Sequence, residues 1–323
     1  MILAPLFEVQ AHQDRVWSLA FSPDSTHLLS CSGDCSINLY SFDSQLFLLK
    51  PLKTFQNHAR AVRRVAWRSD SRAFVSSSFD KSICVYTCTS NDDYSMERIE
   101  GHECEVKAAR FSDQGLLASC SRDRLVWVWE FDEFAEDYEV TSVLHGHDQD
   151  VKNLAWHPSG NIIASCSYDA TIRIWKNEGG LFVADVVLSD HTDTVWSVVF
   201  SKNGEFLYST GADGRLLVYR FECNEVKLVC DFNLGTKHCV YELSVHPLLP
   251  LLAVACGDHS IIIVKISNPF EPVIVERHQS AHQSDVNSVS WHSELPVLAS
   301  GDDIGIIKVW SFNYWLFFYL DGI

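Results

Sequence analysis

Short apolar runs separated by turn residues recur along the chain, and the clearest set lies near its middle. Residues 151–156 form an apolar run that ends at residues 157–160 (His-Pro-Ser-Gly), a cluster that stops a strand and turns it back. Residues 162–166 form the returning run. Asp169 then precedes residues 171–175, where the β-branched residues that strands favour are frequent. This pattern predicts three short strands joined by two turns.

Four side chains of this segment are expected to stabilise its second turn. The carboxylate of Asp169 can accept hydrogen bonds from the amides of its own turn. His147 and Ser165 supply groups able to bond to that carboxylate and to each other, and Trp175 adds a ring to bury and one donor. We therefore interpret all four residues as structural.

The segment is one copy of a repeat with a period of 44 to 46 residues. The opening position recurs as His12, His58, His102, His147, His191, Thr236 and His282. The turn acid follows 21 or 22 positions later as Asp34, Asp80, Asp123, Asp169, Asp213 and Asp258. The third copy also repeats the serine and the tryptophan, as Ser119 and Trp129. Seven copies at this period predict an all-β fold, a seven-bladed β-propeller built from four-stranded blades.

Two copies depart from the pattern. The sixth has Thr236 at the histidine position and Val254 at the serine position. In the seventh, Ile304 occupies the acid position, because Asp302 and Asp303 come too early in the chain. We therefore expect weaker polar bracing in blades six and seven than in blades three and four.

The beginning of the chain is expected to close the ring. Residues 6–10 alternate apolar and polar positions without a partner strand of their own, and the seventh copy lacks its outer strand. Pairing the two would cover an exposed sheet edge. We expect residues 1–312 to form a single propeller in which residues 5–11 complete blade seven, followed by an apolar tail at 313–323. No helical pattern of useful length occurs, and residues 130–139 are interpreted as a solvated, acidic hairpin loop between the third and fourth strands of blade three.

Charge and composition narrow the classes of partner. The net charge of −17 argues against general nucleic-acid binding, because phosphate contacts require a basic face. The sequence shows neither a secretory signal segment nor a span of about 20 apolar residues. We expect a protein of the cytosol or nucleus, with no membrane and no nucleic acid among its partners.

The eleven cysteines are interpreted as structural. Cys31, Cys120 and Cys166 occupy the same strand position in three copies, which is typical of small buried side chains in a reducing compartment. The C-x₃-C pairs that begin at Cys31 and Cys84 have no second pair nearby in the sequence. They are therefore not expected to bind a metal ion.

Motifs that would indicate catalysis are missing from the sequence. It contains no phosphate-binding loop, no nucleophile elbow and no zinc-binding His-Glu-x-x-His segment. We predict no catalytic residue, no metal and no cofactor, and expect recognition of other proteins. The fold by itself leaves an enzyme open, since some propellers are hydrolases.

The repeat resembles a WD40 repeat, with Gly-His at 146–147 opening it and Ile-Trp at 174–175 in place of the usual ending. In that family the upper rim is formed by the two residues flanking the aliphatic four positions after the histidine, and by the residue before the turn acid. Here those positions include Arg63, Lys107, Arg122, Lys152, Trp17, Phe79, Tyr168, Trp196 and Tyr241. Cations beside rings are typical of binding hot spots. In the alternative interpretation, some of them pair with Glu105 and Asp150 and merely ring the channel.

Longer stretches resemble one WD40 family in particular. Residues 119–130 (SCSRDRLVWVWE) place Trp127 two positions before Trp129. The resemblance continues in order at residues 147–156, 167–176, 191–198 and 281–291. Together these stretches are similar to the WD40 subunit of the cytosolic iron–sulfur protein assembly machinery, and they cover nearly the whole ring.

The resemblance implies a non-catalytic docking platform that holds no cluster itself. The implied partners are a small adaptor subunit, a helical-repeat scaffold subunit, a hydrogenase-like cluster carrier and client apoproteins, and clients and adaptors commonly end in an acidic-aromatic tail. Arg122 falls in the matching Ser-Arg-Asp motif, so the family's partner surface is carried over to that position. Ile304 and the ending at 313–323 depart from the family. The alternative is a generic WD40 adaptor, such as a ubiquitin-ligase substrate receptor or a chromatin reader.

Overall fold

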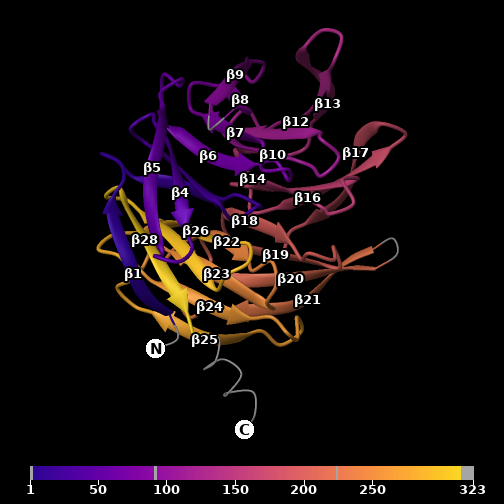
Figure 1. Cartoon of the computed structure of the whole chain (residues 1–323). Helices are drawn as coiled ribbons and strands as arrows, with labels where there is room; N and C mark the ends of the chain where they lie inside the picture. The colour runs from indigo at the N-terminus through magenta and orange to yellow at the C-terminus, as the bar shows by residue number, and fades with distance from the viewer. Residues whose placement is uncertain (1–2, 91–92, 223–224, 314–323) are drawn as a thin grey trace.

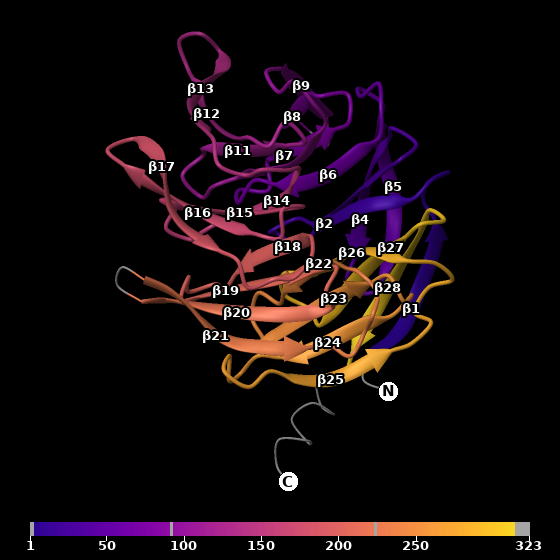
Figure 2. The same cartoon turned by 180° about the vertical axis from the view of Figure 1, so that it is seen from behind.

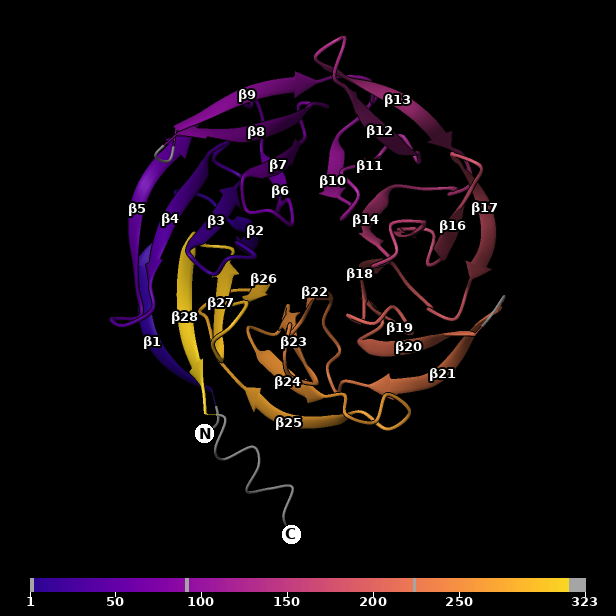
Figure 3. The same cartoon turned by 45° about the vertical axis from the view of Figure 1, so that its right-hand side comes forward.

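The computed structural model describes residues 3–90, 93–222 and 225–313, which form seven antiparallel four-stranded sheets arranged in a ring (Figure 1; Figure 2 from behind). Figure 3 shows the first strand of each blade nearest the axis and the last strand at the periphery. The predicted seven-bladed propeller is confirmed. None of the described residues forms a helix, so none of them provides a helical membrane span.

The first four blades follow the chain in order. Blade one contains β2 (Val16–Phe21), β3 (His27–Ser32), β4 (Ile37–Asp43) and β5 (Leu48–Phe55). Blade two contains β6 (Val62–Trp67), β7 (Ala73–Ser78), β8 (Ile83–Ser90) and β9 (Asp93–Ile99). Blade three contains β10 (Val106–Phe111), β11 (Leu117–Ser121), β12 (Val126–Asp132) and β13 (Asp137–Leu144). Blade four contains β14 (Val151–Trp156), β15 (Ile162–Ser167), β16 (Ile172–Glu178) and β17 (Leu181–Leu188).

The last three blades complete the ring. Blade five contains β18 (Val195–Phe200), β19 (Phe206–Gly211), β20 (Arg215–Glu222) and β21 (Glu225–Asn233). Blade six contains β22 (Val240–Val245), β23 (Leu251–Cys256), β24 (Ile261–Lys265) and β25 (Val273–His278). Blade seven contains β26 (Val286–Trp291), β27 (Val297–Asp302), β28 (Ile306–Phe312) and β1 (Leu3–Gln10).

The two ends of the described chain meet in blade seven, as predicted. β1 pairs antiparallel with β28, from Leu3 opposite Phe312 to Gln10 opposite Ile306. The side-chain amide of Gln10 also donates to the carbonyl of Ile304 at 2.7 Å. The N-terminal strand therefore covers the edge of β28, which would otherwise offer unpaired backbone groups. The predicted tail lies outside the described residues from residue 314 onward.

The acidic insert of blade three is more ordered than predicted. β12 continues to Asp132 and β13 begins at Asp137, so only residues 133–136 form the connecting turn. Phe131 and Tyr138 face each other across the two strands, with ring centres 5.2 Å apart. The predicted hairpin is therefore present, and its turn is shorter than predicted because cross-strand pairing of the aromatic residues extends both strands.

The apolar core is divided into seven clusters, one between each pair of neighbouring blades. In the cluster between blades three and four, Val128 packs with Leu154 and Trp175, all of them buried. Each sheet thus buries both faces against its neighbours, which explains why the second strand of each blade is almost entirely buried. The core holds the blades at fixed positions around the axis.

The predicted polar network is present in blades three and four. In each blade, Nδ1 of the histidine is hydrogen-bonded to the turn acid and Nε2 to the strand serine. In blade three, His102 lies 2.7 Å from Asp123 and 2.8 Å from Ser119. In blade four, His147 lies 2.8 Å from both Asp169 and Ser165. The indoles of Trp129 and Trp175 donate to the same serines at 2.9 Å. Burial acts to raise the pKa of the turn acid Asp169, but hydrogen bonds from histidine, threonine and backbone outweigh it and hold that pKa below its ordinary value. The network anchors the turn that carries the upper rim.

Blade seven contradicts the prediction of weaker bracing. Nδ1 of His282 lies 2.8 Å from Oδ2 of Asp302, and Nε2 lies 2.6 Å from Oγ of Ser300. The indole of Trp310 donates to Ser300 at 2.7 Å, so the full network is present. Asp302 stands at the end of β27, two residues before Ile304, and also accepts from the amide of Ile304 at 3.1 Å. The prediction was wrong because the aspartate side chain is long enough to reach the histidine from this earlier position.

Blade six lacks the histidine–serine bonds among its described residues, as predicted. Thr236 and Val254 occupy those positions, and Val254 is fully buried. Asp258 instead accepts from the amide of Ser260 at 3.2 Å and lies 3.3 Å from a guanidinium nitrogen of Arg277. The aspartate and arginine side chains are about a quarter and a fifth exposed, respectively, so solvent screens this pair more than the buried pair of blade seven.

Candidate functional site

A cavity of about 250 Å³ opens at the centre of the upper face, the face that carries the turns between the second and third strands of each blade. Its lining residues are Arg15, Trp17, Arg63, Phe79, Lys107, Lys152, Trp196, Tyr241, Asp285, Asn287 and Asp303. Seven of the nine predicted partner-binding residues therefore meet in one cavity. The other two, Arg122 and Tyr168, lie beside it.

Strand alternation explains why these side chains point toward the axis. Val106 and Val151 begin the inner strands β10 and β14 and are fully buried in the core between blades. Because neighbouring residues of a strand point in opposite directions, Lys107 and Lys152 face the central cavity. The repeat therefore places one rim residue per blade around the same opening.

The cationic side of the cavity consists of charged side chains held over aromatic rings. Measured to the ring centre, the contacts are Lys107 to Phe79 at 4.1 Å, Lys152 to Tyr168 at 4.8 Å and to Trp196 at 5.1 Å, and Arg63 to Trp17 at 4.7 Å. Such a contact contributes roughly 0.5–1 kcal/mol at an exposed site and more when it is desolvated. The rings hold the cations in place but do not neutralise their charge.

The two lysines are poorly solvated. Burial, reinforced by the positive charge of Lys152, lowers the pKa of Lys107 to about 8. Burial also lowers the pKa of Lys152, whose Nζ lies 3.4 Å from Oδ2 of Asp150. Among the described residues, no carboxylate lies within ion-pair distance of Lys107. A negatively charged ligand group in the cavity would therefore stabilise both ammonium groups.

The opposite side of the cavity is acidic and internally bonded. The hydroxyl of Tyr241 donates to Asp285 at 3.0 Å, and the side-chain amide of Asn287 donates to Asp303 at 2.7 Å. A guanidinium nitrogen of Arg15 lies 3.8 Å from the carboxylate of Asp303. The cavity is thus polarised, with positive charge over blades two to four and the carboxylates of Asp285 and Asp303 in blade seven.

Arg122 lies on the rim and is paired with Glu105, as the alternative interpretation of the rim residues expected. Its Nη1 is 3.4 Å from both carboxylate oxygens of Glu105, and Arg60 approaches the same carboxylate at 3.4 Å. The side chain of Arg122 is 57% exposed, so water screens this pair. Tyr168 is also exposed, and its ring contacts the ammonium group of Lys152, which lines the cavity. Neither residue lines the cavity itself.

Four lining residues fall outside the predicted set: Arg15, Asp285, Asn287 and Asp303. All four occupy the same rim positions in blades one and seven, so the repeat alignment contained the signal that locates them. Asp285, Asn287 and Asp303 were passed over because cations and rings were favoured, and Arg15 because it lies outside the cationic group of blades two to four. The acidic half of the cavity was missed for that reason.

None of the described cysteines lines the cavity, although Cys239 contacts the lining residues Trp196 and Tyr241. Among the described residues, no group of three or more His, Cys, Asp and Glu side chains is placed to hold a metal ion. Cys31 and Cys84 are buried free thiols, and burial raises the pKa of both, that of Cys84 to about 11. A raised thiol pKa disfavours the thiolate, the form that binds metals.

The chain matches the family model of the WD domain, G-beta repeat. The matched segments are residues 3–41, 49–87, 94–130, 138–176, 185–220 and 275–311. Together they cover more than half of the chain. The longest unmatched stretch contains most of blade six, where Thr236 and Val254 interrupt the repeat pattern.

Curated relatives are similar over nearly their whole length. A Vanderwaltozyma polyspora protein named probable cytosolic iron-sulfur protein assembly protein 1 is 34% identical over 343 residues, covering 94% of this chain and 98% of the relative. A Caenorhabditis elegans protein named probable cytosolic iron-sulfur protein assembly protein CIAO1 homolog is 34% identical over 316 residues, covering 92% and 94%. A Candida glabrata protein with the first of these names is 33% identical over 329 residues, covering 94% and 97%.

Proposed function

Since the chain belongs to the WD40-repeat family and, within it, to the cytosolic iron–sulfur protein assembly proteins, we propose that it serves this assembly as a non-catalytic docking platform. A propeller suits this role because its rigid ring presents rim side chains from every blade at one opening. The upper-face cavity is the part of the described surface where this proposal places the partner.

The observation that carries the proposal is the pair of poorly solvated lysines, Lys107 and Lys152, beside aromatic rings. A carboxylate bound in the cavity would stabilise the two ammonium groups and so replace the solvation that they lose through burial. An aromatic side chain on the same ligand would pack against Phe79 or Trp196. The cavity therefore suits an acidic-aromatic peptide tail of the kind that the family resemblance implies.

The proposed partners are protein subunits of the assembly machinery and its clients. We assign to them a small adaptor, a helical-repeat scaffold, a hydrogenase-like cluster carrier and client iron–sulfur apoproteins, in the cytosol and the nucleus. The platform itself is proposed to hold no cluster. The buried position and raised pKa of the thiols at Cys31 and Cys84 support that part of the proposal.

Affinity capture tests the proposed function. The tagged chain is recovered from cell extract and its partners are quantified by mass spectrometry, beside Lys107→Glu and, as a control on the opposite face, Lys202→Glu. We expect iron–sulfur assembly components with the wild type and the control, and their loss with Lys107→Glu. Recovery of ubiquitin-ligase subunits or histones in their place would support the generic adaptor and overturn the proposal.

A further inference from the structure

Charged side chains continue into the axial channel below the upper cavity. Arg64 on β6, Arg110 on β10 and Glu242 on β22 interrupt inner strands that are otherwise largely apolar. Arg64 and Glu242 are buried, and Arg110 is half-buried. Because burying a charge is costly unless it is paired, each of these groups calls for a partner.

Glu242 is fully engaged by other groups. One carboxylate oxygen bonds to Nη1 of Arg64, across the channel from β6 to β22. The other accepts from the hydroxyl of Ser288 and from the amide of Val289, at 3.3 Å in the second case. Glu242 therefore neutralises Arg64, and among the described residues it forms no ion pair with Arg110.

Arg110 has no such partner. The indole of Trp156 reaches only the backbone carbonyl of Arg110, at 2.9 Å, and does not pair with its guanidinium. Among the described residues its guanidinium forms no ion pair, and its buried Nε has no acceptor. The Nε of Arg64 is buried and unpaired as well. Burial, reinforced by the charge of Arg64, lowers the pKa of Arg110 to about 10, so the group stays charged at neutral pH.

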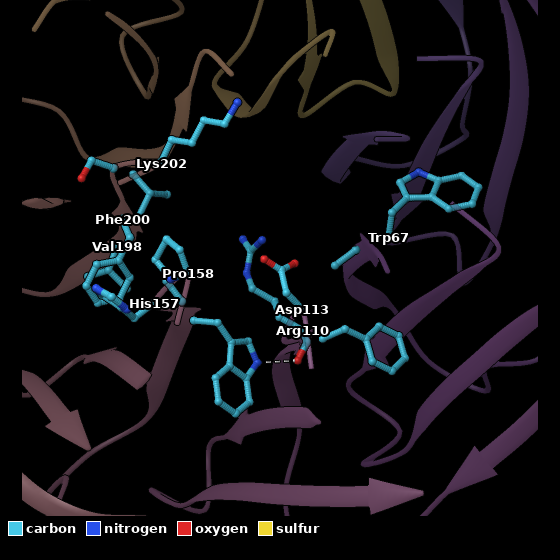
Figure 4. A pocket seen from close by; sticks show the side chains of 14 residues that line it. Trp67, Arg110, Asp113, His157, Pro158, Val198, Phe200 and Lys202 are labelled. Atoms are coloured by element: carbon cyan, nitrogen blue, oxygen red, sulfur yellow. Dashed lines mark hydrogen bonds between the residues drawn. The ribbon is translucent and has the colours of Figure 1, made fainter. Parts of the chain in front are cut away.

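Two adjoining cavities meet at Arg110. One, of about 360 Å³, opens on the lower face and includes Asp113, His157 and Lys202 in its lining. The other, of about 320 Å³, includes Arg64 and Glu242. Figure 4 shows the guanidinium of Arg110 pointing into the open space, with Lys202 reaching toward the same space from blade five.

The titratable groups facing this space leave an excess of positive charge. Arg64, Arg110 and Lys202 face the carboxylates of Glu242 and Asp113. The exposed carboxylate of Asp113 forms no ion pair with Arg110 among the described residues. His157 also lines the lower cavity, but burial lowers its pKa and its Nε2 lies 3.2 Å from the carbonyl of Gly204, so it adds no charge at neutral pH.

We propose that this lower channel site binds a small phosphate-bearing anion, held by the guanidinium of Arg110 with Lys202 at its rim. The planar guanidinium can hold two oxygens of the anion through parallel hydrogen bonds. A phosphate fits better than a carboxylate, because it brings close to two negative charges and three or more acceptor oxygens to donors that converge from different strands. The site lies on the face opposite the docking cavity and does not depend on the proposed function.

Calorimetric titration of the full chain at low ionic strength tests the site. The probes are inorganic phosphate, ribose 5-phosphate as a small phosphate monoester, and acetate as the carboxylate. We expect one phosphate per chain, weaker acetate binding, and at least a tenfold loss of phosphate affinity in Arg110→Gln, since charged hydrogen bonds contribute roughly 1.5–3 kcal/mol each. Tighter binding of ribose 5-phosphate would identify an organic phosphate as the ligand, and tighter binding of inorganic phosphate would identify the free ion.

Matched variants separate this site from other cationic surfaces. Arg220→Gln makes the same change on an exposed strand of blade five, where Arg220 pairs with Glu222, and should bind phosphate like the wild type. If the melt shows that Arg110→Gln is misfolded, Arg110→Lys serves instead and should lose part of the affinity, because it keeps the charge without the fork. The proposal is overturned by wild-type protein that shows no saturable phosphate binding. It is also overturned if acetate binds as tightly as phosphate, or if Arg220→Gln loses as much phosphate affinity as the Arg110 variants.

Discussion

Asp302 bonds to His282 from a strand position two residues ahead of the acid position in the other blades, and both side chains are completely buried. The pair closes blade seven, the blade in which the first and last described strands meet. Burial lowers the pKa of His282, and an ionised carboxylate only accepts hydrogen bonds. The neutral histidine therefore donates through Nδ1 and accepts from Ser300 through Nε2.

This buried pair predicts that removing the turn acid costs more stability in blade seven than in blade six. Asp302→Ala should lower the free energy of unfolding by roughly 3–5 kcal/mol, because it leaves a buried donor and the turn amides without their acceptor. Asp258→Ala in blade six should cost only about 1 kcal/mol, because its partner Arg277 is partly exposed. Urea unfolding of both variants beside the wild type measures the difference. Equal losses would show that the regular position, and not burial, determines the contribution.

Acid should destabilise the protein well above the range in which carboxylates titrate. Burial, with a smaller effect of His292, lowers the pKa of His246 to about 4, below the value of about 6.5 expected in the unfolded chain. The unfolded state then binds more protons between these two values, so the stabilisation is complete above about pH 6.5 and is lost as the pH falls toward 4.

We expect the protonation of His246 to lower the free energy of unfolding by on the order of 2 kcal/mol between about pH 7 and pH 5. Guanidinium unfolding at the two pH values measures it. His246→Asn cannot titrate but keeps an acceptor for the amide of Leu248, now bonded to the ring at 3.1 Å. This variant should show the smaller fall, and a fall as large as that of the wild type would assign the effect to other groups.

Removal of residues 1–10 should destroy the cooperative melt. The deletion strips β1 from β28 and leaves a long strand edge unpaired, which favours aggregation. Removal of residues 314–323, which follow the last described residue, is the matched control and should leave the melt unchanged. Light scattering and a thermal scan distinguish the two truncations. Intact cooperativity after the N-terminal deletion would mean that β1 does not stabilise the ring.

The ring was predictable because each repeat position has a local physical purpose: a histidine, a turn acid and alternating apolar residues recur at a constant spacing. The bracing of blade seven was not predictable from that spacing. It depends on how far the side chain of Asp302 reaches, which an alignment of positions does not contain. The same limit explains the short turn at residues 133–136, where cross-strand packing extends both strands despite an acidic composition.

The rim residues were predictable because strand alternation sets the direction of each side chain, but their electrostatic state was not. Lys107 is partly buried without an ion-pair partner among the described residues, whereas Arg122 is exposed and paired with Glu105. The channel arginines Arg64 and Arg110 left a visible signal, charged residues inside the apolar inner strands VRRVAW and VKAARF, which the sequence analysis did not use.

Anaerobically purified protein should carry neither stoichiometric iron nor stoichiometric zinc. The thiols of Cys31 and Cys84 are buried with raised pKa values, so they are poor sources of the thiolates that bind these metals. Elemental analysis by mass spectrometry checks the content. One tightly bound equivalent that disappears in a Cys31→Ser, Cys35→Ser double variant would contradict the prediction.

The most direct test of the docking account is a fluorescence anisotropy titration with a labelled peptide that has an acidic residue before a C-terminal aromatic residue. The wild type should bind it saturably, and Lys107→Glu should weaken binding by at least tenfold, because it places a negative charge in a poorly solvated site. Arg122→Glu, on the exposed rim, should cost only about 1 kcal/mol or less. Lys202→Glu on the opposite face should bind like the wild type, and all melts should coincide. Absence of binding by the wild type, or equal binding by Lys107→Glu, would contradict the account.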